Sequence, residues 1–83
     1  MAQQTYYVVV PFGRDEDGHI VPGEAKEAPN GERAQRRARA IATASGCVGA
    51  LAFSRSGDPS NGEFGDATVL ATFGEVELGA LMG

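Results

Sequence analysis

The segment from Glu32 to Ser45, ERAQRRARAIATAS, constrains the fold most because it is the one long stretch with helical periodicity. Asn30 lies just before it as a candidate N-cap, and Gly46 lies where a C-terminal glycine cap falls. Small or apolar residues recur at helical spacing, at Ala34, Ala38, Ile41, Ala42 and Ser45. The sequence therefore predicts one helix over residues 32–45 that packs closely against a sheet through this alanine face.

Three segments rich in β-branched and aromatic residues predict that sheet: 5–12 (TYYVVVPF), 47–54 (CVGALAFS) and 66–73 (DATVLATF). The last two are joined by a turn-rich loop and are expected to form a hairpin. Asp17 and Gly18 form a favoured turn pair, so residues 19–21 could return as an extra short strand after the first. We predict an α+β fold of β-α-β-β order, with one helix on one face of a three-stranded, mostly antiparallel sheet.

The expected arrangement leaves one face of the sheet without a helix. The helix is expected to cross from the first strand to the second, and the third strand to lie between these two, antiparallel to both. The helix would then cover Leu51, Phe53, Val69, Ala71 and Phe73. The opposite face would carry Tyr7, Val9, Val48, Ala50, Ala52 and Leu70 beside Thr68 and Thr72. This face is too apolar to meet water, so we predict a homodimer with Tyr7, Val9 and Leu70 at its interface. The alternative is a dimer that continues the sheet through an unpaired edge strand.

The length of the chain, 83 residues, predicts a single small domain over residues 1–83, with 75–83 as a docked or mobile tail. Cys47 is the only cysteine, so no intrachain disulfide can form. His19 is the only histidine, so the common zinc arrangements lack their ligands. The apolar run near the N-terminus has only a strand's length and no basic leader, which predicts a cytoplasmic protein without a membrane span. The net charge of −4 argues against a nucleic-acid binder that relies on overall charge.

The stretch GRDEDGHIVPGE, residues 13–24, resembles a calcium-binding EF-hand loop in part, with Asp15, Asp17 and Glu24 at acidic positions. Gly13 offers no side-chain ligand at the first position, and a strand, not a helix, precedes the loop. We therefore predict a solvated acidic turn and no metal or cofactor, the alternative being a weak divalent site on those three carboxylates.

Two segments are candidate recognition surfaces. The first is the outer side of the helix, with Arg33, Arg36, Arg37 and Arg39. An ordinary charged surface, with Glu32 paired to Arg36, is the simpler interpretation, and a phosphate backbone or an acidic protein is the alternative. The second is the loop over residues 55–65, with Arg55, Asp58 and Asn61. Cys47 and His19 are the only nucleophilic pairing and lie far apart in the chain, so no enzyme is predicted.

Residues 6–12 (YYVVVPF), 52–59 (AFSRSGDP) and 62–74 (GEFGDATVLATFG) together resemble short uncharacterised bacterial proteins, including prophage-associated reading frames. This resemblance implies a bacterial, cytoplasmic, non-enzymatic protein. The leading hypothesis is a small, self-associating protein-interaction or accessory module. The alternative is a nucleic-acid-associated protein that uses helix 32–45.

Overall fold

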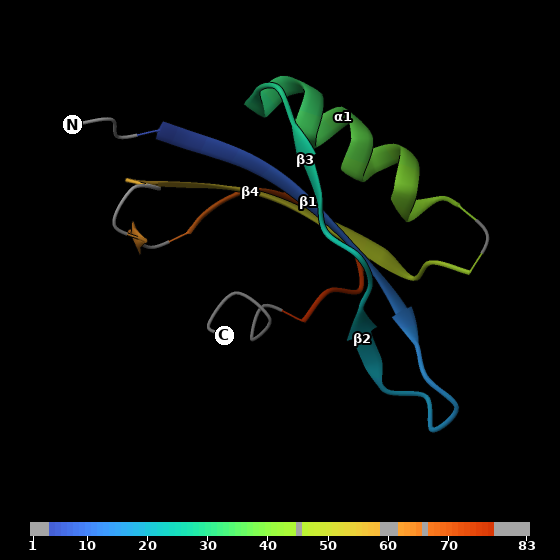
Figure 1. Ribbon diagram of the computed structural model, residues 1–83. Helices are drawn as coiled ribbons and strands as arrows, with labels where there is room; N and C mark the ends of the chain where they lie inside the picture. The colour runs from blue at the N-terminus through green and yellow to red at the C-terminus, as the bar shows by residue number, and fades with distance from the viewer. Residues whose placement is uncertain (1–3, 45, 59–61, 66, 78–83) are drawn as a thin grey trace.

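The computed structural model describes residues 4–44, 46–58, 62–65 and 67–77, which form one helix and a six-stranded sheet. The helix α1 (Gly31–Ala42) lies across one face of the sheet, and the β1–β2 hairpin extends away from it (Figure 1). The strands are β1 (Gln4–Arg14), β2 (Ile20–Pro22), β3 (Lys26–Ala28), β4 (Gly49–Asp58), β5 (Glu63–Phe64) and β6 (Thr68–Gly74). The predicted α+β class is confirmed, but the predicted count of three strands is too low.

The centre of the sheet is formed by β1 and β4, which pair antiparallel from Gln4 opposite Gly57 to Phe12 opposite Gly49. The strands β2 and β3 both pair with the other side of β1, and β5 and β6 pair with the other side of β4. All these pairings are antiparallel. The prediction that the last long strand lies between the other two is therefore wrong, because β4 lies between β1 and β6.

The short strands β2 and β3 explain this difference. They return the chain along β1, so that Ala28 lies opposite Tyr7 near the start of β1. The helix then runs back over β1, and β4 begins opposite the end of β1, where the amide of Val48 donates to the carbonyl oxygen of Phe12 at 2.8 Å. The crossover therefore connects β3 to β4, which flank β1 and are both antiparallel to it.

The boundaries of α1 follow from its caps. The side chain of Asn30 accepts a hydrogen bond from the amide of Arg33 at 2.8 Å, which confirms the predicted N-cap. The helix ends at Ala42 and not at Ser45, because the amide and the hydroxyl of Thr43 both donate to the carbonyl oxygen of Ala40. Ser45 lies outside the described residues.

The face of the sheet under α1 is not the predicted one. The helix packs on Val9, Ala50 and Ala52, which are fully buried with Ala34 and Ala38 of the helix itself. The small side chains of β4 let the alanine face approach the sheet closely. Tyr7 and Leu70 are partly buried against the same cluster. The predicted dimer surface of Tyr7, Val9 and Leu70 is therefore wrong: these residues belong to the interior of the chain.

The second face of the sheet, opposite α1, carries a separate apolar cluster formed by Val10, Phe12, Leu51 and Phe53. Val8, Ile20, Val48, Ala67 and Val76 pack against it, so part of the predicted tail docks here. Residues 78–83 of that tail lie outside the described part of the chain. The chain therefore covers much of this face by itself.

A register shift in β6 decides which of its residues reach each face. Ala71 lies opposite Ala52, but Val69 lies opposite Phe53, so Leu70 is the extra residue of a β-bulge. Leu70 consequently packs under α1, whereas Val69 shares the second face with Phe53. The predicted single face of Val69, Ala71 and Phe73 is therefore divided between the two sides of the sheet.

Candidate functional site

A groove of about 420 Å³ lies on the second face, over β1, β4 and the segment that contains β3. We call it the β1–β4 groove. Its lining combines apolar side chains with charged ones: Tyr6, Val8, Ala25, Lys26, Glu27, Phe53 and Arg55. A hollow of this size is within the usual range for binding sites.

The strand register builds this groove. Val8 of β1 lies between Phe53 of β4 and Glu27 of β3, and Tyr6 lies opposite Arg55. Directly opposed residues of antiparallel strands point to the same face, so these five side chains share the second face. Val8 and Phe53 form an apolar floor next to the Tyr6–Arg55 pair, and Glu27 lies on the β3 side.

The polar groups of the groove are held by neighbouring residues. The hydroxyl of Tyr6 donates to Oε1 of Gln4 at 3.0 Å, and the Nε atom of Arg55 is buried. Lys26 pairs with Glu24, and its ammonium group, through a hydrogen bond and then through its charge, holds the pKa of the exposed Glu24 carboxyl below its ordinary value. Arg55 lies opposite Tyr6 in the strand register and lines the groove with it, so it brings a positive charge to the edge of the apolar floor.

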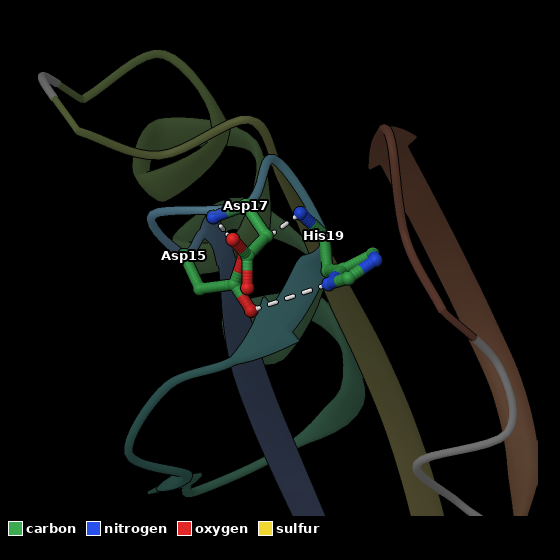
Figure 2. A group of neighbouring side chains, drawn as sticks. All are labelled: Asp15, Asp17 and His19. Carbon is green, nitrogen blue, oxygen red and sulfur yellow. Dashed lines mark hydrogen bonds and ion pairs between the residues drawn. The ribbon is translucent and has the colours of Figure 1, made fainter.

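The acidic turn lies at the tip of the β1–β2 hairpin, where Asp15, Asp17 and His19 come together (Figure 2). Oδ1 of Asp15 accepts from the amides of Asp17 and His19, both at 2.9 Å, and Nδ1 of His19 lies 3.5 Å from Oδ2 of Asp15. All three residues are exposed. The carboxylate of Asp15 thus stabilises the turn.

The alternative ligand set of Asp15, Asp17 and Glu24 is not the one that assembles in the described structure. Glu24 pairs with Lys26, and His19 joins the two aspartates instead. The spacing of two residues from Asp15 to Asp17 and on to His19 is visible in the sequence, but the hairpin geometry is needed to bring the three together. The absence of a metal stays a prediction.

The predicted partner-binding residues do not form one surface. Arg33, Arg36, Arg37 and Arg39 are exposed on α1, where Nη2 of Arg36 contacts Oε1 of Glu32 at 3.1 Å, as predicted. Nη1 of Arg37 lies 3.5 Å from the carbonyl oxygen of Glu27. Arg55, in contrast, belongs to the β1–β4 groove on the other side of the sheet. The predicted loop over residues 55–65 is partly strand: Asp58 ends β4, and Glu63–Phe64 form β5. Asn61 lies outside the described residues.

Sequence reasoning missed the groove because it missed β3. The alternation of Tyr6 and Val8 along the first strand was visible, but nothing placed Lys26 and Glu27 beside it. No helix in the described ranges is long and apolar enough to cross a membrane. Comparisons of the chain with protein-family models, with curated proteins and with solved structures find no match.

Proposed function

We propose that this chain is a small, self-associating interaction module that binds a segment of a partner protein in the β1–β4 groove and performs no catalysis. The observation that carries the proposal is the apolar floor of Val8 and Phe53 beside the Tyr6–Arg55 pair, on a face that α1 does not cover. An apolar surface rimmed by charged groups is typical of a protein-binding site.

The lining residues define the chemistry of the partner segment. A large apolar side chain of the partner would lie on Val8 and Phe53, and burial of such a side chain contributes roughly 1.5–3 kcal/mol. A neighbouring Asp or Glu of the partner would pair with Arg55, whose guanidinium can bind a carboxylate in two places. The partner segment is therefore an apolar residue flanked by an acidic one.

The proposal is tested by selecting peptides from a random phage-displayed library on the immobilised chain. The selected peptides should share a large apolar residue next to Asp or Glu. Synthetic versions should shift the amide NMR signals of Val8, Phe53 and Arg55. Changing Arg55→Gln should weaken binding about tenfold or more, because a hydrogen bond to a charged group is lost.

The matched control is Arg39→Gln on the exposed side of α1, which removes the same positive charge from the other side of the sheet. It should leave peptide binding unchanged. Val8→Lys should abolish binding, and its circular dichroism spectrum shows whether the variant remains folded. Peptides without an acidic residue, or signals that shift on α1 instead, would contradict the proposal.

A second candidate function is nucleic-acid binding through α1. The observation in its favour is that Arg33, Arg36, Arg37 and Arg39 are all exposed on one helix. Such a row can contact a phosphate backbone. The overall charge of −4 opposes it, so this candidate ranks below the groove.

A further inference from the structure

The outer edge of the sheet at β6 differs from the edge on the other side. The strand β6 pairs with β4, and no described strand pairs with its other side. Such an edge presents a row of backbone N–H and C=O groups that another strand can pair with. The question is whether the sequence of β6 protects this edge.

The sequence of β6, TVLATFG, contains no charged residue and no proline, and Val69 is 44% exposed. Both charged side chains and proline are common ways to protect an edge strand. The opposite edge has both kinds of protection, because β2 ends at Pro22 and β3 carries Lys26 and Glu27. These two strands also have only three residues each. Among the described strands, β6 therefore has the longest open edge without such protection.

We propose that a second copy of this chain pairs antiparallel with β6, edge to edge, about a two-fold axis. An uncharged strand can meet its own copy without bringing like charges together, and one symmetric contact satisfies both open edges. Glu75, which follows β6, is already paired with Arg14 and adds little repulsion at this joint. The bulge bends β6 at Leu70 and Gly74 has a positive φ, so the regular segment 71–73 forms the centre of the contact.

This inference rests on the self-association included in the proposed function and not on the groove. It replaces a dimer formed through a sheet face by one formed through a sheet edge. A short chain gains buried surface by such an association. Peptide binding in the groove and pairing at β6 use different strand positions, so the two can be tested separately.

Sedimentation equilibrium at tens of micromolar protein tests the proposal. The wild-type chain should show twice the mass of one chain. The double variant Val69→Lys with Thr72→Lys, both at exposed positions, should be monomeric at the same concentration, because each edge then carries two positive charges. The control double variant Gln35→Lys with Ala40→Lys adds the same charge to exposed positions of α1 and should remain dimeric.

Cysteine crosslinking gives a second test that does not require the lysine variant to fold. In a Cys47→Ser background, single cysteines are placed in turn at Thr68, Val69, Ala71 and Thr72. Oxidation should crosslink two copies at one or two neighbouring positions, because only residues near a two-fold axis approach their own copies closely enough. A cysteine at Val21 of β2, on the protected edge, should give no crosslink.

The outcomes separate the two proposals. A dimer that survives the β6 lysines and gives no β6 crosslink overturns edge pairing but leaves self-association intact. A wild-type chain that remains a monomer at high concentration overturns edge pairing and self-association together. Peptide binding in the groove is measured in a separate experiment and does not depend on this result. If the chain is a monomer and only an added extended peptide protects the β6 amides from hydrogen exchange, the occupant of this edge is a peptide. This result would overturn pairing with a second copy.

Discussion

At the scale of single residues, two glycines let β4 and β6 meet. Gly49 lies opposite Gly74, and a Cβ atom on Gly49 would collide with the backbone of Glu75. Gly74 has a φ of 70°, and a Cβ there would collide with the carbonyl oxygen of Val48. That oxygen accepts the amide of Glu75 at 2.9 Å, so the close approach is part of the strand pairing. We expect Gly49→Ala to lower the free energy of unfolding by about 1–3 kcal/mol, measured by urea denaturation.

Gly65 provides the control for this prediction. A Cβ on Gly65 would meet its nearest atom, the carbonyl oxygen of Ser56, at 3.5 Å, which is an ordinary contact. Gly65→Ala should therefore change the free energy of unfolding by less than about 0.5 kcal/mol. Equal effects of the two substitutions would show that Gly49 acts through backbone flexibility and not through close packing.

At the scale of elements, α1 depends on its cap and on its alanine face. The only side-chain group that caps its first turn within the described residues is Asn30. We expect Asn30→Ala to destabilise the protein by about 1 kcal/mol, because the amide of Arg33 loses its acceptor. Thermal unfolding followed by circular dichroism measures this. Asn30→Asp keeps an acceptor and should behave like the wild type, whereas a loss with both variants would point to another role for Asn30.

At the scale of the whole molecule, the distribution of charge decides between the two candidate functions. The arginines of α1 lie on one side of the sheet, but the whole chain carries a net charge of −4. We expect labelled single- and double-stranded DNA to bind weakly at low salt and not at physiological salt, because few counterions are released. A gel-shift or anisotropy titration measures this. Changing Arg33, Arg36, Arg37 and Arg39 to Gln should remove the low-salt complexes.

The corresponding control changes two arginines outside α1 to Gln: Arg55, on the other side of the sheet, and Arg14, at the β1–β2 hairpin. These changes should leave the low-salt DNA complexes unaffected if α1 is the contact. Tight, salt-sensitive complexes at physiological salt would reverse the ranking and make α1 the functional surface.

The sequence alone determined the local elements that are long enough to carry a strong signal. The helix follows from Asn30 and the spacing of Ala34 and Ala38, and the long strands follow from their β-branched and aromatic residues. These signals depend on neighbours within one or two turns, or within one strand. The predicted pairing of the last two long strands as a hairpin is likewise confirmed by β4 and β6.

Only the tertiary structure decided which face of the sheet meets the helix, and therefore where the candidate site lies. Both faces of β1 are apolar, with Val9 on one and Val10 on the other, so alternation could not choose between them. The choice depends on Ala50 and Ala52, which admit the helix, and on the bulge at Leu70, which no local pattern indicates. The three-residue strands β2 and β3 also form only because β1 is available to pair with them, since so short a segment is not stable as a strand alone.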